Sequence, residues 1–171
     1  MFQGTGAVAL GSIAGQTNQQ QEAVAIGRYA GCQTQGTSAV AIGTGAGFIN
    51  QGANSIAIGY QAGAYGATAG STFGQDINAI AIGSSAGSTF QGQSAVAIGI
   101  QAGQNGQSQN SISIGANAGQ NTQGAYSVAI GGTAGAYSQG SSSVAVGIGA
   151  GYISQGDNCV AIGNNAGQTF Q

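Results

Sequence analysis

The sequence of 171 residues contains no proline, tryptophan or histidine, and only 2% of its residues are charged, whereas ordinary globular domains have about 25%. Without histidine, neither a Ser-His-Asp triad nor an imidazole metal site can form. Arg28 is the one basic residue, and the net charge is −2. The chain therefore lacks the clustered lysine and arginine that nucleic-acid binding requires.

Long apolar runs and targeting signals are missing as well. No apolar segment approaches the roughly 20 residues that a membrane-spanning helix needs. Residues 1–4, Met-Phe-Gln-Gly, lead directly into the repeats described below and show no basic start or apolar signal segment. We expect either that the protein is not exported by that route or that a targeting part is missing from this chain.

What the sequence has in abundance is one short motif, seen as Ser-Val-Ala-Ile-Gly at residues 127–131, which occurs ten times with small variations. The spacing between successive copies is 16, except between Ile56 and Ile80, where it is 24. The β-branched residues at alternate positions indicate strands and argue against a disordered linker. Each copy is followed at a nearly constant distance by a glutamine: Gln19, Gln35, Gln51, Gln75, Gln91, Gln107, Gln123, Gln139, Gln155 and Gln171.

This period predicts an all-β fold, a parallel β-solenoid of ten 16-residue coils. Each coil would have two short strands, with a glycine permitting the tight corner after the first. With coils about 4.8 Å apart, the rod would be on the order of 50 Å long. The longer spacing predicts an eight-residue insertion at about residues 64–71, forming a loop that bulges from one edge. We expect residues 1–171 to form a single repeat domain.

Successive side chains of a strand point to opposite sides, so each strand has one face of large apolar residues and one face of small residues. We expect the large apolar residues to fill the inside of the coil. Two such residues per coil make a thin core, so a lone chain would be marginal and more surface would be buried between chains. The small residues would then form a flat inter-chain packing face. Its members would be Ala9, Ala25, Ala41, Ala57, Ala81, Ala97, Ala129, Ala145 and Ala161.

The glutamine column predicts a second structural feature. Side-chain amides stacked one per coil can donate hydrogen bonds from each coil to the next. We therefore expect a partly buried structural ladder here, and not a ligand site.

Acidic and thiol side chains are too scattered for catalysis or for a disulfide. Glu22, Asp76 and Asp157 would lie about 14 and 24 Å apart along the rod, whereas paired-carboxylate hydrolysis needs about 5–9.5 Å. Cys32 and Cys159 would be about 38 Å apart, beyond the reach of about 7 Å between the Cα atoms of a disulfide. We expect no enzymatic activity, no cofactor and no metal site.

The segments Asn-Ser-Ile-Ala-Ile-Gly at 54–59 and Ser-Val-Ala-Ile-Gly at 127–131 resemble the head repeats of YadA-like trimeric autotransporter adhesins. Similar repeats occur in haemagglutinin-like surface proteins and in some viral or phage fibre proteins. The resemblance implies a left-handed parallel β-roll packed as a homotrimer. It would place Val128 and Ile130 inside the roll, and Ser127 and Ala129 nearer the neighbouring chain. The strict unit of 16 departs from the usually shorter adhesin repeat, and no neck, stalk or anchor segment is visible.

Two regions are candidate contact sites. Loops on rigid scaffolds often carry binding, so we expect contacts at the insertion through Tyr60, Tyr65, Thr68, Thr72 and Phe73. The repeats also continue to both ends without the polar caps that solenoids usually have. The rods would therefore stack end to end or belong to a longer fibre, with end-to-end contacts through Phe2, Gln3, Phe170 and Gln171.

These features favour a non-enzymatic structural protein that builds a surface fibre or self-assembling filament by packing with itself, as a homotrimer, head to tail, or both. The alternative is an adhesin head module that binds a host surface or matrix ligand. Ice binding is less favoured, because the threonines are scattered and do not form columns. Either main function would place the protein outside the cell or on a particle surface.

Overall fold

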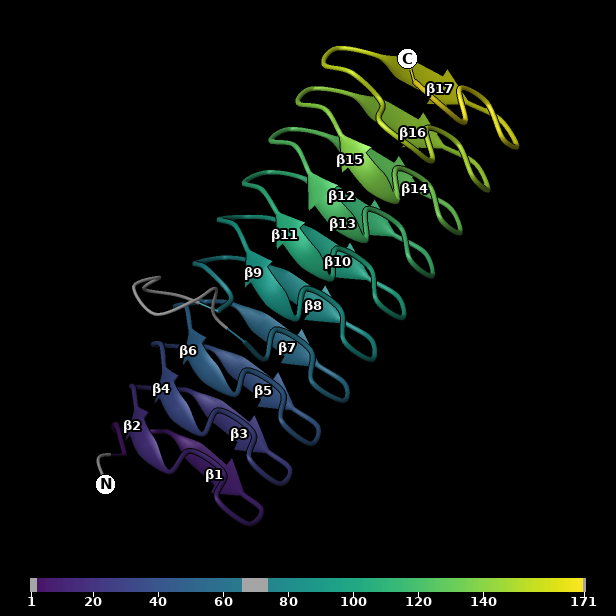
Figure 1. Cartoon of the computed structure of the whole chain (residues 1–171). Helices are drawn as coiled ribbons and strands as arrows, with labels where there is room; N and C mark the ends of the chain where they lie inside the picture. Colours follow the sequence, from purple (N-terminus) through teal and green to yellow (C-terminus); the bar gives the residue numbers. More distant parts are fainter. Residues whose placement is uncertain (1–2, 66–73, 171) are drawn as a thin grey trace.

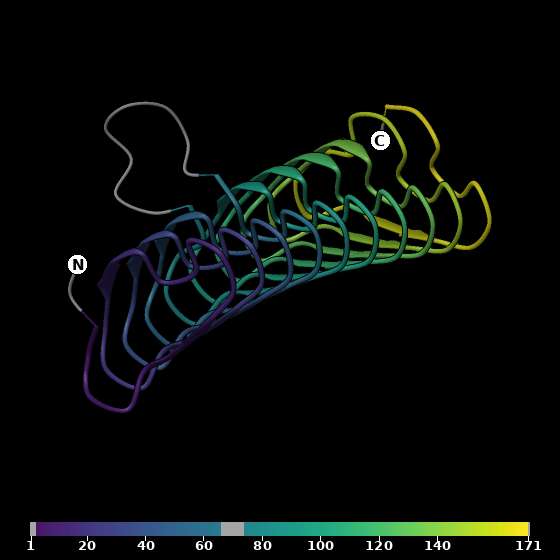
Figure 2. The same ribbon diagram turned by 90° about the horizontal axis from the view of Figure 1, so that it is seen from below.

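The computed structural model describes residues 3–65 and 74–170, which form a rod of stacked coils (Figure 1). Figure 2 shows the coils following one another along the rod. The expected parallel β-solenoid of 16-residue coils is confirmed. In the described ranges every regular element is a strand, and no helix is long and apolar enough to cross a membrane.

One side of the rod is a parallel sheet of ten three-residue strands, one from each copy of the motif. Equivalent residues pair directly, as in Val96↔Ile112 and Ile98↔Ile114, so the sequence repeat sets the register. The strands are β1 (Val8–Leu10), β3 (Val24–Ile26), β5 (Val40–Ile42), β7 (Ile56–Ile58), β8 (Ile80–Ile82), β10 (Val96–Ile98), β12 (Ile112–Ile114), β14 (Val128–Ile130), β16 (Val144–Val146) and β17 (Val160–Ile162).

The second side of the rod carries two shorter sheets. Each strand of these sheets ends at one of the regularly spaced glutamines. Isolated parallel bridges, such as Gln51↔Gln75 and Gln75↔Gln91, continue this side between the sheets. One sheet contains β2 (Thr17–Gln19), β4 (Gln33–Gln35) and β6 (Ile49–Gln51), and the other contains β9 (Thr89–Gln91), β11 (Asn105–Gln107), β13 (Asn121–Gln123) and β15 (Tyr137–Gln139).

The irregular spacing does not interrupt the stack. Strands β7 and β8 pair in register through Ile56↔Ile80, and Tyr65 bridges Thr89 on the other side. Ala64 and Tyr65 thus belong to the regular coil, and the chain is back in register at Gln75. The extra residues are therefore 66–73, two positions later than the predicted 64–71. The predicted loop itself lies outside the described residues.

The glycine that ends each motif strand is required by close backbone approach between coils. Gly99 has φ 128°, and a Cβ atom on it would lie 2.6 Å from the carbonyl oxygen of Gly115 in the next coil. An L-residue is disfavoured by this φ, and the neighbouring backbone leaves no room for its side chain. This explains the glycine after the second apolar residue in the nine copies that are followed by another coil, and Gly163 in the last copy has a similar φ of 120°.

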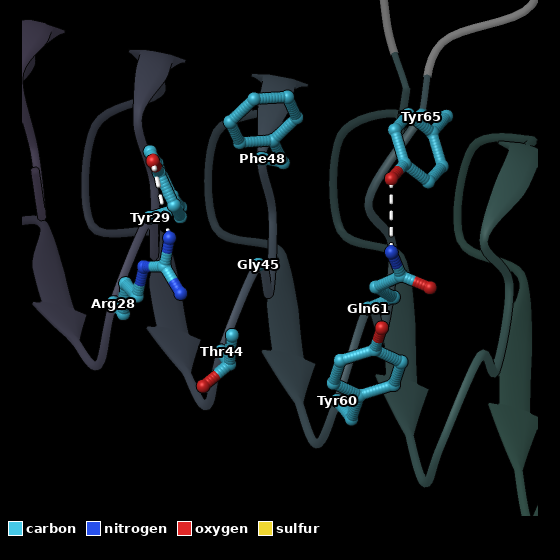
Figure 3. A pocket seen from close by; sticks show the side chains of 8 residues that line it. All are labelled: Arg28, Tyr29, Thr44, Gly45, Phe48, Tyr60, Gln61 and Tyr65. Carbon is cyan, nitrogen blue, oxygen red and sulfur yellow. Dashed lines mark hydrogen bonds between the residues drawn. The ribbon is translucent and has the colours of Figure 1, made fainter.

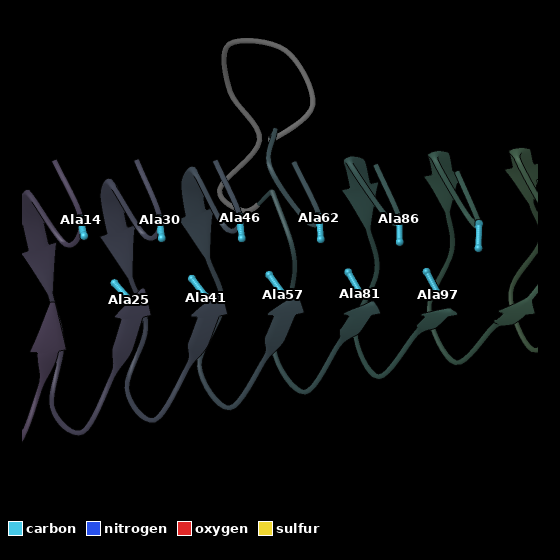
Figure 4. Close-up of a cluster of buried hydrophobic side chains, with 11 residues drawn as sticks. Ala14, Ala25, Ala30, Ala41, Ala46, Ala57, Ala62, Ala81, Ala86 and Ala97 are labelled. Carbon is cyan, nitrogen blue, oxygen red and sulfur yellow. The ribbon is translucent and has the colours of Figure 1, made fainter. Parts of the chain in front are cut away.

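The structure reverses the predicted orientation of the strands. The central residue of each strand, which is Ser113 in β12 and alanine in the others, points into the coil. There the alanines face alanines from the second side, as Figure 4 shows for Ala25 to Ala97 opposite Ala14 to Ala86. The flanking valines and isoleucines point outward and are half-buried or exposed. Val128 and Ile130 therefore do not fill the roll, and Ser127 and Ala129 are fully buried within their own chain.

The predicted alanine packing face is accordingly wrong. Ala9, in the first coil, is exposed. The other members are at most 2% exposed, inside their own coil, and cannot touch another chain: Ala25, Ala41, Ala57, Ala81, Ala97, Ala129, Ala145 and Ala161. The physical reason is the narrow interior. A Cβ atom added to Gly103 would lie 3.3 Å from the Ala97 Cβ atom, so the space between the walls admits methyl groups but no branched side chain.

The residue before each outward valine or isoleucine also points inward, and it is alanine, serine or cysteine. The serine hydroxyls at this position donate hydrogen bonds to nearby backbone carbonyls. Ser127 Oγ donates to the Gly124 carbonyl at 2.6 Å, and Ser143 Oγ donates to the Gly140 carbonyl at 2.6 Å. A small polar side chain is therefore accommodated inside without leaving an unpaired hydroxyl.

The predicted glutamine ladder is confirmed in part, and it is more deeply buried than expected. Direct amide-to-amide bonds join four pairs of neighbouring coils: Gln19 to Gln35, Gln51 to Gln75, Gln75 to Gln91 and Gln123 to Gln139. The amide of Gln75 donates to the Ile56 and Ala79 carbonyls and to Gln91 Oε1, at 2.7, 3.1 and 3.2 Å. Ser113 joins the ladder, accepting from Gln107 and donating to Gln123. Among the described residues, four glutamine Oε1 atoms are buried without a partner, those of Gln19, Gln51, Gln107 and Gln155. The glutamines are thus a polar core that ties both sides together.

Candidate functional surfaces

The outward valines, isoleucines and leucine of the ten-stranded sheet form one continuous apolar strip, which we call the outer sheet face. Its members stack at the same two positions in every coil, as in Ile98, Ile114 and Ile130, which are 36–38% exposed. Over ten strands about 4.8 Å apart, the strip is roughly 40 Å long and about 10 Å wide. It carries no charged side chain, because every residue of these strands is apolar or serine.

A second surface feature lies near the insertion, where side chains from the second, third and fourth coils surround a hollow of about 230 Å³ (Figure 3). Most of its lining consists of aromatic and uncharged polar groups, together with the only basic side chain of the protein. We call it the aromatic hollow. Its lining residues are Arg28, Tyr29, Thr44, Gly45, Phe48, Tyr60, Gln61 and Tyr65.

Three aromatic rings run along the upper wall of the hollow in Figure 3. Tyr29 and Phe48 meet edge to face with centroids 6.0 Å apart, and Phe48 and Tyr65 do the same at 6.1 Å. Such contacts add roughly 0.5–1.5 kcal/mol beyond burial. Gln61 Nε2 donates to the Tyr65 hydroxyl at 2.9 Å. These contacts hold rings from successive coils in fixed positions around the hollow.

Arg28 extends over the Tyr29 ring, with its guanidinium carbon 4.7 Å from the ring centroid. Its Nη2 group donates to the Tyr29 hydroxyl at 3.5 Å, which is long for a hydrogen bond. A guanidinium has five N–H donors. The aromatic ring therefore positions the cation and leaves most of its hydrogen-bonding capacity for another group.

Tyr29 occupies a backbone conformation that tyrosine disfavours, with φ 60°. The same position has positive φ in the other coils, where it is filled by Ile13, Gly45, Gln61, Ser85, Gln101, Asn117, Thr133, Gly149 and Asn165. The equivalent position one coil above Tyr29 is Gly45, which has no side chain and so leaves the hollow open between Tyr29 and Gln61.

The structure brings together only some of the predicted contact residues. Tyr60 and Tyr65 both line the hollow and are 56% and 40% exposed. Thr68, Thr72 and Phe73 lie outside the described residues. The prediction missed Arg28, Tyr29, Phe48 and Gln61. The available signal was alignment of the coils, since side chains at equivalent positions of successive repeats become neighbours in the stack.

The predicted end-to-end residues are only partly described. Phe170 is 81% exposed, and Gln3 is exposed with its amide donating to the Ala7 carbonyl at 3.1 Å. Phe2 and Gln171 lie outside the described residues. End-to-end contact therefore stays a prediction.

The remaining reactive side chains within residues 3–65 and 74–170 lie apart from the hollow. Cys32 and Cys159 are both free, and burial raises the pKa of the Cys32 thiol. Tyr137 and Tyr152 form a third edge-to-face pair, with ring centroids 5.3 Å apart. Desolvation together with the Tyr137 hydroxyl raises the pKa of Tyr152. The three carboxylates accept local hydrogen bonds: Glu22 from Ser38, Asp76 from the Ile77 amide and Asp157 from the Ser141 amide.

The fold and its surfaces define a structural repeat protein, a parallel β-solenoid with an apolar outer sheet face. The family model described as the YadA head domain repeat matches residues 51–69, in two copies. The chain thus contains repeats of the YadA head type, as the motif predicted. No curated protein and no solved structure matches the chain.

Proposed function

We propose that this protein is a structural module of a surface fibre, which assembles with copies of itself through the outer sheet face. The observation that carries the proposal is the continuous row of half-buried and exposed valine, isoleucine and leucine side chains along ten strands. Contiguous apolar patches above a few hundred Å² are rare on monomers and mark interaction sites. A strip about 40 Å by 10 Å reaches that range.

The interior of the coil supports the same proposal. Its apolar part consists of alanines, the smallest side chains that bury a methyl group, and burying one methyl or methylene contributes only about 0.8 kcal/mol. The larger apolar groups remain at the surface of the single chain. Covering them with another copy would add the hydrophobic stabilisation that the coil interior is too narrow to provide. The YadA-type repeats favour three copies as the assembly.

Two lysines on the outer sheet face are expected to break this assembly. The wild-type protein should have three times the 16.3 kDa mass of one chain, whereas the double variant Ile98→Lys, Ile114→Lys should be monomeric, because burying two unpaired charges per chain opposes association. Light scattering coupled to gel filtration measures the masses, and circular dichroism reports whether β-structure is retained.

A matched control adds the same charge elsewhere. Gln93 and Gln109 are exposed, also at equivalent positions of adjacent coils, and lie outside the outer sheet face, so Gln93→Lys, Gln109→Lys should keep the wild-type mass. A wild-type protein that is monomeric at high concentration would contradict the proposal, as would assembly of the Ile98→Lys, Ile114→Lys variant.

A second candidate function is that of an adhesin head module binding a host surface or matrix ligand. The match to the YadA head repeat and the aromatic hollow beside the insertion favour it. Both candidates place the protein outside the cell or on a particle surface, and they are compatible, since a fibre can present binding sites along its length.

Deleting residues 66–73 tests the contribution of the insertion to such binding. The deletion joins Tyr65 to Gly74 and places Gln75 sixteen positions after Gln51, which is the spacing of the other coils. We therefore expect the free energy of unfolding to change by no more than about 1 kcal/mol. Binding to immobilised matrix proteins and to cells should fall at least tenfold. Unchanged binding by the folded deletion variant would show that the insertion is not a contact site.

A further inference from the structure

The aromatic hollow contains a cation that the fold does not explain. Arg28 is the only lysine or arginine in the sequence. Within the described part of the chain, the carboxylates of Glu22, Asp76 and Asp157 each accept hydrogen bonds from groups other than Arg28. The equivalent positions of adjacent coils are Ser12 and Thr44, so the stacking of coils needs no charge here. The arginine therefore points to an anionic partner from outside the chain.

The neighbouring backbone shapes the hollow. Tyr29 has φ 60°, and positive φ recurs at this position along the stack, as for Ile13 at 65° and Thr133 at 55°. The Tyr29 ring supports the guanidinium. In the next coil, Gly45 has no side chain, so an open gap lies in front of the aromatic ring.

The lining restricts the chemistry of the occupant. Tyr29, Phe48 and Tyr65 offer ring surface to an apolar face, while Thr44 and Gln61 offer hydroxyl and amide groups. The guanidinium matches a planar carboxylate through two parallel hydrogen bonds. At about 230 Å³, the hollow is smaller than drug-sized sites of roughly 300–1,000 Å³. The occupant should be one small ring with an apolar face, several hydroxyls and one carboxylate.

A pyranose with a carboxylate substituent combines these features, because its axial C–H groups form an apolar face and its hydroxyls lie around the rim. Nucleic acid does not suit the hollow, since a single cation cannot neutralise several phosphates. A purely apolar ligand would desolvate Arg28 and Gln61 without compensation.

We propose that the aromatic hollow binds one acidic sugar ring of a surface glycan, with Arg28 pairing with the carboxylate and the aromatic rings packing against the C–H face. This inference rests on the second candidate function, the head module that contacts a host surface. It assigns to that function a ligand class, a carboxylated saccharide, and a location in the second to fourth coils.

Titration of the intact protein with methyl glucuronide and with methyl N-acetylneuraminide, followed by NMR or calorimetry, tests the proposal and distinguishes the two types of acidic sugar. We expect at least one to bind with a dissociation constant of about 1 mM, as suits a single ring. Methyl glucoside, which lacks the carboxylate, should bind at least tenfold more weakly. Sodium acetate should also bind at least tenfold more weakly, since it lacks the ring.

Variants locate the site and separate its parts. Arg28→Gln should weaken binding of the acidic sugar at least tenfold and remove most of the preference over methyl glucoside. Gly45→Asn should abolish binding by filling the hollow, while the fold is kept because Asn117 and Asn165 occupy this position at φ 57° and 54°. Thr133→Asn, at the same position of a distant coil, should bind as the wild type does.

Three results would overturn the proposal: no saturable binding of either acidic sugar, equal binding of methyl glucoside, or unchanged binding by a folded Gly45→Asn variant. Equal affinity for acetate would also overturn it, by showing a simple anion contact. If saccharide binding fails while the wild-type protein still adheres to cells, only this inference fails. If the wild-type protein adheres to no surface, the head function itself fails.

Discussion

Replacing Ala97 by leucine is expected to destabilise the solenoid by about 3 kcal/mol or more, at the upper end of what overpacking costs. Ala97 is completely buried, and the Cβ position of Gly103 lies 3.3 Å from its methyl group. The three additional carbon atoms would have to displace the opposite wall of the coil. Because each coil pairs with both neighbours, the displacement would propagate along the stack. Urea unfolding followed by circular dichroism, at one fixed protein concentration, measures the effect.

Ala97→Ser is the matched control, since Ser113 occupies the same position one coil further on. The Ser113 hydroxyl accepts from Gln107 and donates to Gln123. A hydroxyl at position 97 could donate in the same way to Gln107 Oε1, a buried oxygen without a partner in the described residues. We therefore expect Ala97→Ser to change the free energy of unfolding by less than about 1 kcal/mol. Similar small effects for leucine and serine would mean that Ala97 points outward after all.

Replacing Gln91 by leucine should destabilise the protein by about 3 kcal/mol, although the two side chains are similar in size. Gln91 is fully buried, and its amide donates to the Ile80 and Ala95 carbonyls at 2.7 and 3.1 Å. Its oxygen accepts from Gln75 at 3.2 Å. Leucine would leave these groups buried without their partner, at about 1–3 kcal/mol for each group that stays unpaired. Thermal and urea unfolding both measure the loss.

The control for this change is Gln93→Leu, two positions away on the exposed surface, where the effect should stay within about 0.5 kcal/mol. If Gln91→Leu proved as stable as the wild type, the glutamine ladder would contribute nothing net to stability. Its regular occurrence would then need another explanation.

The candidate sites were only partly predictable. Tyr60 and Tyr65 were expected near a contact site because they flank the insertion, and both line the aromatic hollow. Arg28 and Phe48 come from earlier coils, and nothing in the local sequence joins them to Tyr65. Their proximity depends on the stacking of coils, which brings together residues from similar positions of successive repeats and fixes the ring contacts between Tyr29, Phe48 and Tyr65.

The sequence by itself determined the coil, its period, the register and the glutamine ladder, because each is a direct consequence of a motif that recurs once in every coil. Alternation along a strand also gave two distinct faces, as in Ala97 between Val96 and Ile98. Which face lies inside was decided only by the tertiary structure. The usual rule places large apolar residues in the core, but the two walls of this coil are so close that only a small side chain, such as alanine or serine, fits at position 97 opposite Gly103. Steric exclusion therefore outweighs the preference for burying valine and isoleucine, and these residues form the outer surface.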